Sequence, residues 1–270
     1  MALIVNSNIS SLNAQRQLTN STNELGVSYE RLSSGKRINS AKDDAAGLQI
    51  SSRLTAQVNG LNQASRNAND GISLAQTAEG ALDEYTNTLQ RMRTLAVQSS
   101  NGSNTAADRG ALDSEYTELE AELVRIASQT SFGGVSLLDG TYSANFQVGA
   151  DASQTISISI TANFATTVGT TGDITSFDNA QTAILKMDSA LATVTDARAD
   201  LGAKQNRFSS VIRSNDNTAQ NVSASRSRIE DADYAKESAM LARNSVLQQA
   251  SSSMLAQANQ QPQIALSLLN

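Results

Sequence analysis

The feature that most constrains the fold is an unbroken heptad pattern between residues 180 and 229. Positions alternately four and three residues apart are mostly apolar, namely Ala180, Ile184, Met187, Leu191, Val194, Arg198, Leu201, Gln205, Phe208, Ile212, Asn215, Ala219, Val222, Arg226 and Ile229. A 3.5-residue period of this length is typical of one helix, far longer than globular domains use, that winds against partner helices. The sequence therefore predicts a rod.

Two upstream segments repeat the pattern. One has residues seven apart at Leu54, Leu61, Ala68, Ala75, Leu82, Leu89 and Ala96, with Val58, Ile72, Tyr85 and Met92 on the same face. The other has Leu112, Tyr116, Leu119, Leu123 and Ile126, after a polar turn at residues 101–109. We expect a mainly α fold, a long coiled-coil helical bundle. An ordinary globular bundle is the alternative, but such bundles seldom need strict heptads over so many turns.

The composition argues against an enzyme. The 270 residues include no His and no Cys, which excludes the usual zinc sites, a Ser-His-Asp triad, a Cys-His pair and a disulfide framework. No Gly-rich phosphate loop is present. The pair Asp43 and Asp44 is better suited to a helix N-terminus than to a metal. We expect no catalytic residue, no cofactor and no metal.

Charge and hydropathy exclude two classes of partner. The net charge is −6 and the pI is about 4.8, without a basic stripe, so nucleic acid is not expected. The longest apolar runs are only a few residues, so membrane insertion is not expected either. Residues 1–5 lack the basic and apolar regions of a cleavable secretory signal.

The helix surfaces are low in charge. Charged residues make up 17% of the chain, and the flanking heptad positions are mostly Ser, Thr, Asn, Gln and Ala. Small uncharged side chains cost little to desolvate, which suits helices covered by other copies of the chain. A sparsely charged but exposed surface is the alternative.

Both termini carry narrow apolar stripes. Leu18, Leu25 and Leu32 form one, and Met240, Leu247, Met254 and Leu268 form another in the register set by Ile184 and Leu191. Between residues 231 and 238 that register turns polar, so the long C-terminal helix is expected to change partner there. Two such helices would be marginal alone. We expect them to pair as an inner coiled coil and to order fully on burial in an assembly.

Residues 133–178 have a β-like pattern. Ile156, Ile158 and Ile160 alternate with serines, as in a half-buried strand. We expect Gly133-Gly134 to end the third helix, and residues 166–173 to form an exposed loop. The prediction is a small β-hairpin region lying on the bundle.

Three segments together resemble bacterial flagellins. Residues 30–51 (ERLSSGKRINSAKDDAAGLQIS) are similar to the N-terminal signature of that family, residues 227–238 (SRIEDADYAKES) to the C-terminal signature, and residues 260–269 to the usual tail. The resemblance covers nearly the whole chain. Where many flagellins insert outer domains, this chain has only the loop near residues 165–178, so it resembles a minimal form with two inner domains.

The resemblance implies a function. Flagellins are exported unfolded by the flagellar type III apparatus with the help of a chaperone, and they polymerise beneath a cap into an extracellular helical tube that acts as a propeller. It implies inner-tube helices at 1–43 and 232–270, an outer-tube bundle at 44–231, and linkers at 33–42 and 231–238. The inner-tube assembly residues would be those of the two terminal stripes.

Two rival functions follow from related proteins. A hook–filament junction protein shares similar terminal helices. A flagellin carrying a His-dependent metalloprotease insertion is excluded, because the chain has neither His nor an insertion.

The resemblance also implies a receptor site. In flagellins detected by the animal flagellin-sensing Toll-like receptor, a bundle surface contributes residues matched here by Gln90, Arg91, Leu95 and Glu118. Thr94 stands where some detected members carry an acidic residue. An alternative role for Arg91 is an ion pair with a carboxylate across a filament contact.

Overall fold

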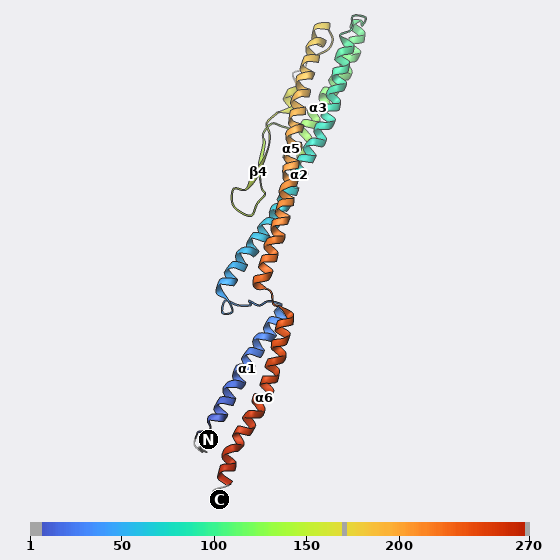
Figure 1. The fold of residues 1–270 in the computed structure, drawn as a ribbon. Helices are drawn as coiled ribbons and strands as arrows, with labels where there is room; N and C mark the ends of the chain where they lie inside the picture. Colours follow the sequence, from blue (N-terminus) through green and yellow to red (C-terminus); the bar gives the residue numbers. More distant parts are fainter. Residues whose placement is uncertain (1–6, 169–171, 268–270) are drawn as a thin grey trace. The chain divides into compact units, whose positions relative to one another are not determined.

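The computed structural model describes residues 7–168 and 172–267 (Figure 1). In order along the chain, its elements are α1 (Ile9–Ser34), α2 (Ala45–Ser99), α3 (Ala106–Gln129), β1 (Ser131–Phe132), β2 (Val135–Ser136), β3 (Tyr142–Gln147), β4 (Thr155–Ile160), α4 (Phe164–Val168), α5 (Phe177–Glu230) and α6 (Tyr234–Ser267). The chain forms two compact units, residues 1–56 with 221–270 and residues 57–220. Helices α2 and α5 each contribute to both units.

The predicted helical seams are confirmed. Every position of the heptad pattern in α5 is buried or half-buried, and the same holds for the stripes of α2 and α3. Within residues 57–220 these three helices lie side by side (Figure 1). Tyr85, Leu123 and Phe208, one from each helix, are completely buried in a single continuous core. The fold is mainly α, as predicted.

The polar residues within the α5 seam each find a partner. Arg198 forms an ion pair with Asp83 at 2.9 Å, and Gln205 donates to Glu79 at 2.6 Å. The side-chain amide of Asn215, 8% exposed, donates to the carbonyl of Val148 at 2.9 Å. Arg226 donates to the Thr55 hydroxyl at 3.3 Å. Because a buried polar group without a partner is costly, such pairs fix which residues of the neighbouring segments face α5.

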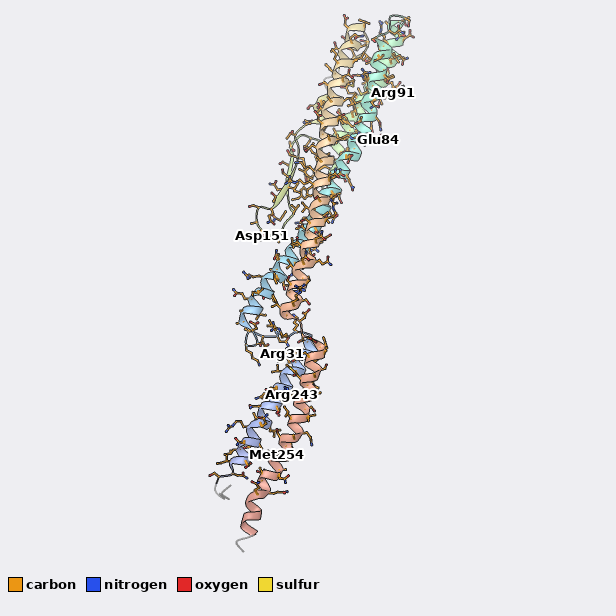
Figure 2. All side chains as sticks on the ribbon, in the orientation of Figure 1. Arg31, Glu84, Arg91, Asp151, Arg243 and Met254 are labelled. Carbon is orange, nitrogen blue, oxygen red and sulfur yellow. The ribbon has the colours of Figure 1, made fainter. Side chains whose placement is uncertain are left out.

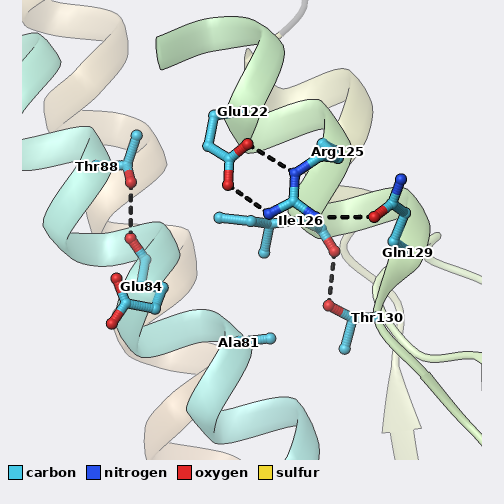
Figure 3. Close-up of a pocket in the computed structure, with 8 residues that line it drawn as sticks. All are labelled: Ala81, Glu84, Thr88, Glu122, Arg125, Ile126, Gln129 and Thr130. Carbon is cyan, nitrogen blue, oxygen red and sulfur yellow. Dashed lines mark hydrogen bonds and ion pairs between the residues drawn. The ribbon is translucent and has the colours of Figure 1, made fainter.

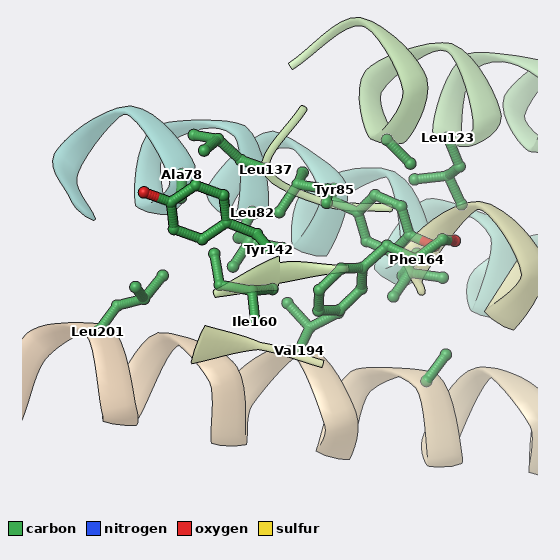
Figure 4. Close-up of a cluster of buried hydrophobic side chains, with 14 of the residues drawn as sticks. Ala78, Leu82, Tyr85, Leu123, Leu137, Tyr142, Ile160, Phe164, Val194 and Leu201 are labelled. Carbon is green, nitrogen blue, oxygen red and sulfur yellow. The ribbon is translucent and has the colours of Figure 1, made fainter. Parts of the chain in front are cut away.

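The strands form two short antiparallel hairpins. Strands β3 and β4 pair from Tyr142 opposite Ile160 to Gln147 opposite Thr155. The predicted alternation in β4 is confirmed, because Ile156, Ile158 and Ile160 are buried and the serines between them are exposed. Figure 4 shows Tyr142 and Ile160 lying between α2 and α5. The hairpin thus contributes to the bundle core. A two-stranded sheet would be only marginally stable without this packing.

Two local predictions were wrong. Gly133 and Gly134 do not end α3, which stops at Gln129 with Thr130 as its cap. They have φ of 59° and 84° and form the two-residue turn between β1 and β2, a turn that requires positive φ at both positions. Residues 166–168, expected in a loop, belong to α4, where the Asn163 side chain accepts from the Thr166 backbone N–H at 3.1 Å.

The acidic pair Asp43 and Asp44 serves local backbone structure. Asp44 accepts from the backbone N–H of Gly47 at 2.7 Å in the first turn of α2. Asp43 accepts from the backbone N–H and the hydroxyl of Ser40, and these bonds lower the pKa of Asp43. The helix-capping interpretation is confirmed for Asp44. No helix in the described ranges 7–168 and 172–267 is both long and apolar enough to cross a bilayer.

Candidate assembly surface

The contact between α1 and α6 is lined by small and polar side chains. The two helices lie side by side (Figure 1), and their buried residues recur seven apart, at Ser21 and Ser28 on α1 and at Glu237, Asn244, Ser251 and Ala258 on α6. Small residues let the two backbones approach closely but bury little apolar surface. The fully buried positions of this seam therefore contribute little hydrophobic stabilisation to the intrachain pairing.

Polar contacts along the pair are few and mostly near its surface. Ser11 donates to Asn259 at 2.7 Å, and Gln248 donates to Thr22 at 3.3 Å. Arg31 and Glu237 form an ion pair at 3.4 Å, while Nε of Arg31 is buried without a hydrogen-bond partner. Exposed polar contacts each contribute about 1 kcal/mol or less. Each of these polar contacts therefore adds little to the stability of the pair.

The apolar stripes lie outside this seam. Met240 and Met254 are 39% and 65% exposed, and Leu247 is half-buried. On α1, Leu18, Leu25 and Leu32 are half-buried. Leu268 lies outside the described residues. The sequence pattern places the α6 apolar stripe in the register of the bundle seam. In the structure, the residues three positions before Met240, Leu247 and Met254 are buried instead. The reason is that α6 packs against α1 through its small side chains.

Other large apolar side chains extend the exposed surface. Among the described residues of α1 and α6 they include Ile9, Leu12, Tyr29, Tyr234 and Val246, each at least half exposed. These residues project from more than one side of the helix pair, since neighbours such as Val246 and Leu247 point about 100° apart. We name the whole set, together with Met240, Leu247 and Met254, the terminal apolar face. Exposed apolar residues repeated along two paired helices indicate a surface that another protein covers. Sequence reasoning missed the seam itself, although the serines and small residues at heptad spacing could have revealed it.

A compact network joins the end of α1 to the α5–α6 connection. Gly35, in the left-handed region at φ 72°, accepts from the backbone N–H of Ala232 at 3.0 Å. Arg37 donates its backbone N–H to the Glu230 carbonyl at 2.7 Å and its guanidinium to the Ile229 carbonyl at 2.6 Å. These residues belong to the two sequence signatures, which the fold brings together.

Glu230 is the centre of this network. Its carboxylate pairs with the Lys36 ammonium and accepts from the Ser51 hydroxyl at 2.6 Å. The Glu230 side chain is only 12% exposed. The hydrogen bond from Lys36, followed by that from Ser51, holds the pKa of Glu230 below its usual range. The ionised carboxylate of Glu230, at the end of α5, therefore binds both the loop after α1 and the start of α2.

The residues matched to a receptor surface are divided between surface and core. Gln90 and Arg91 on α2 and Glu118 on α3 are exposed, whereas Leu95 is 1% exposed and packs in the bundle core. Arg91 donates to Glu115 on α3 at 2.8 and 2.5 Å. Arg91 therefore has a carboxylate partner within its own chain.

A hollow of about 400 Å³ between α2 and α3 offers no catalytic arrangement (Figure 3). Its wall includes Arg125, which donates to Glu122 at 2.7 Å and to Gln129 at 2.8 Å. The hydrogen bond from Arg125 lowers the pKa of Glu122, whereas a general acid needs a raised one. Within the described ranges, no cluster of carboxylates is suited to a metal ion.

Two family models match this chain. The bacterial flagellin N-terminal helical region matches residues 5–143, and the bacterial flagellin C-terminal helical region matches residues 184–269. A flagellin of Halalkalibacterium halodurans is 48% identical over 271 residues, covering 99% of this chain and 100% of the relative. The chain belongs to the bacterial flagellin family.

Other relatives agree with this assignment. Flagellin A of Vibrio cholerae is 41% identical over 378 residues, covering 100% of both chains. Because that alignment is longer than this flagellin, the Vibrio protein carries segments that this chain lacks. The crystal structure of Bacillus cereus flagellin has a TM-score of 0.52 at 36% identity, covering 56% of this chain and 88% of that one.

A hook-associated protein shares the fold alone. The structure of a putative flagellar hook-associated protein from Vibrio parahaemolyticus has a TM-score of 0.58 at 14% identity, covering 70% of this chain and 100% of that one. Full-length identity to flagellins favours a structural subunit of the flagellar filament over a junction protein. The chain is a structural protein, not an enzyme, and it self-assembles into a filament.

Proposed function

We propose that this flagellin is exported unfolded by the flagellar type III apparatus and polymerises outside the cell into a helical tube that drives motility. An export chaperone and the filament cap are its proposed partners. The observation that carries the assembly proposal is the terminal apolar face. Residues such as Val246, 69% exposed, stand outside a seam that is itself polar, and in the proposed filament neighbouring subunits cover this face.

The proposed boundaries between the inner-tube and outer-tube parts of the subunit lie within the two sequence signatures. Residues 1–43 and 232–270 form the inner tube, and residues 44–231 form the outer tube with the β-hairpin region at about 133–178. The Glu230 network joins residues from both sides of this proposed boundary, with Lys36 on one side and Ser51 and Glu230 on the other. The stable core of Tyr85, Leu123 and Phe208 supports an outer-tube bundle that folds without the terminal helices.

Deletion of residues 246–270 tests the assembly proposal. The truncated protein should keep the bundle's melting transition but fail to sediment as filaments after seeding. Val246→Asp, which places a charge on the terminal apolar face, should have the same effect, since burying an unpaired charge is costly. Gln249→Asp, one turn away on the same helix, tests the charge alone, because it replaces an exposed polar side chain and removes no apolar one. Normal filaments from the truncated protein would contradict the proposal.

We also propose that an animal flagellin-sensing Toll-like receptor recognises the α2–α3 surface. The exposure of Gln90, Arg91 and Glu118 supports this, while Leu95 acts from the core by holding α2 in place. Arg91→Ala should reduce receptor signalling by purified monomer. Arg66→Ala, an exposed arginine of the same helix that donates to Gln63, is the matched control. Equal responses of the two variants would contradict a receptor role for Arg91.

A further inference from the structure

The methionines of this chain divide sharply between core and surface. The sequence has five methionines and no cysteine. Among the described residues, Met92 and Met187 are completely buried in the bundle core, whereas Met240 and Met254 are 39% and 65% exposed on α6. Figure 2 labels Met254 on α6. The exposed thioethers of the described residues therefore all lie on the helix that carries the terminal apolar face.

Spacing places the two exposed methionines on the same face. They are fourteen residues apart, close to four helical turns, with Leu247 midway between them. Met240 and Leu247 also line a groove of about 570 Å³ between α1 and α6, together with Val27 and Arg243. Both methionines lie outside the buried positions of the seam with α1, and we assign them to the face that a neighbouring subunit covers.

Peroxide chemistry would change the character of this face. A thioether sulfur attacks one oxygen of hydrogen peroxide, and the O–O bond breaks as an S–O bond forms. The departing hydroxide takes the proton from the oxygen now bound to sulfur, which leaves a sulfoxide and water. Sulfur loses two electrons and peroxide gains them. The sulfoxide is polar and a strong hydrogen-bond acceptor, and it can be reduced back by methionine sulfoxide reductases.

We propose that Met240 and Met254 are peroxide-sensitive modification sites that gate polymerisation. In the free subunit both thioethers are open to oxidation, and their sulfoxides would have to be buried without partners at the subunit contact, which opposes assembly. Once the subunit is in a filament, the same contact protects them. The buried Met92 and Met187 stay reduced, so the bundle keeps its stability. The inference rests on the proposed use of the terminal apolar face in assembly.

The experiment compares three proteins before and after hydrogen peroxide. Wild type, M240L/M254L and M254L are oxidised as full-length monomers, mapped by peptide mass spectrometry and seeded for polymerisation. Leucine keeps the volume and apolar character of methionine, so untreated variants should polymerise normally. We expect oxidation at Met240 and Met254 to be at least tenfold faster than at Met92 and Met187. We expect oxidised wild type to lose at least nine-tenths of its sedimentable filament, and M240L/M254L to lose almost none.

Two further measurements keep the gate and the proposed function separate. Treating oxidised wild type with methionine sulfoxide reductases should restore polymerisation, which excludes irreversible damage. Unimpaired polymerisation of oxidised wild type would overturn the gate. Equal loss in oxidised M240L/M254L would also overturn it, because oxidation at another site such as Met1 would then be the cause. Oxidation of preformed filaments at the monomer rate would instead show that the terminal apolar face is not buried, which would overturn the assembly contact itself.

Discussion

Ser51 donates a hydrogen bond to Glu230 at 2.6 Å, which joins the start of α2 to the last residue of α5. Ser51 is 4% exposed, and Lys36 pairs with the same carboxylate from the loop after α1. One side chain therefore connects the end of α5 to the loop after α1 and to the start of α2. Because its partners favour the ionised form, the stability of this junction depends on pH.

The first prediction is acid sensitivity centred on Glu230. The folded-state pKa of this carboxyl is lowered below its ordinary value of 4.5, first by Lys36 and then by Ser51. The stabilisation is therefore present above pH 4.5 and is lost as pH falls through the lowered pKa. Glu230→Gln should remove this carboxyl group's share of the acid dependence of unfolding as pH falls below 4.5, measured by urea unfolding at several pH values.

A surface carboxylate provides the control for this experiment. Asp231 follows Glu230 directly and is exposed. Asp231→Asn should leave most of the acid dependence in place. Filaments should likewise show no transition between about pH 6 and 8, because the chain has no His. An acid profile unchanged in Glu230→Gln would show that other carboxylates control the junction.

Sequence reasoning succeeded where one period dominates. The α5 seam is predictable because each heptad position is buried or half-buried, and even Arg198 and Asn215 occupy seam positions with partners. The α1–α6 contact was not predictable in this way. Hydrophobicity points to Met254, but the chain buries Ser251 and leaves Met254 to solvent. A pattern of apolar residues reveals which face is covered, not whether the cover comes from the same chain.

Local turns show a second limit. Gly133 and Gly134 can end a helix or make a hairpin turn with the same positive φ. What decides between them is the register of Phe132 opposite Val135, a tertiary pairing of two very short strands. Similarly, Leu95 matched a receptor motif by its identity, while its burial follows from the packing of the whole bundle. Neither outcome can be worked out from the local sequence.

A core prediction concerns Phe208. Its ring is completely buried and packs edge to face against Phe146, with centroids 5.7 Å apart. Phe208→Ala should destabilise the bundle by about 3–5 kcal/mol, since it removes apolar contacts and leaves a cavity. Phe177→Ala, at a half-exposed ring at the start of α5, should cost far less. Thermal unfolding of both variants measures the difference, and equal losses would contradict the assigned core.

A glycine prediction follows from the same ring. A Cβ placed on Gly71 would lie 2.8 Å from Cζ of Phe208, too close for an ordinary contact. Overpacking of this kind costs about 1–3 kcal/mol, which outweighs the gain of about 1 kcal/mol in helix propensity. Gly71→Ala should therefore destabilise the bundle. Gly80→Ala in the same helix, where a Cβ meets nothing within 4 Å, should instead stabilise it by about 0.5–1 kcal/mol.

The last prediction separates the two faces of α6. Asn244 is 7% exposed in the polar seam with α1, whereas Val246 projects from the terminal apolar face. A polar residue at a coiled-coil core position lowers stability, so Asn244→Leu should strengthen the α1–α6 pair by about 1 kcal/mol. Hydrogen exchange in free monomer should then show greater protection across residues 234–261. Gln249→Leu, at an exposed position of the same helix, should not change it. Because Asn244 faces α1, the Asn244→Leu protein should still polymerise. The Val246→Asp protein should not. Loss of filaments from both variants would mean that the polar seam also contacts other subunits.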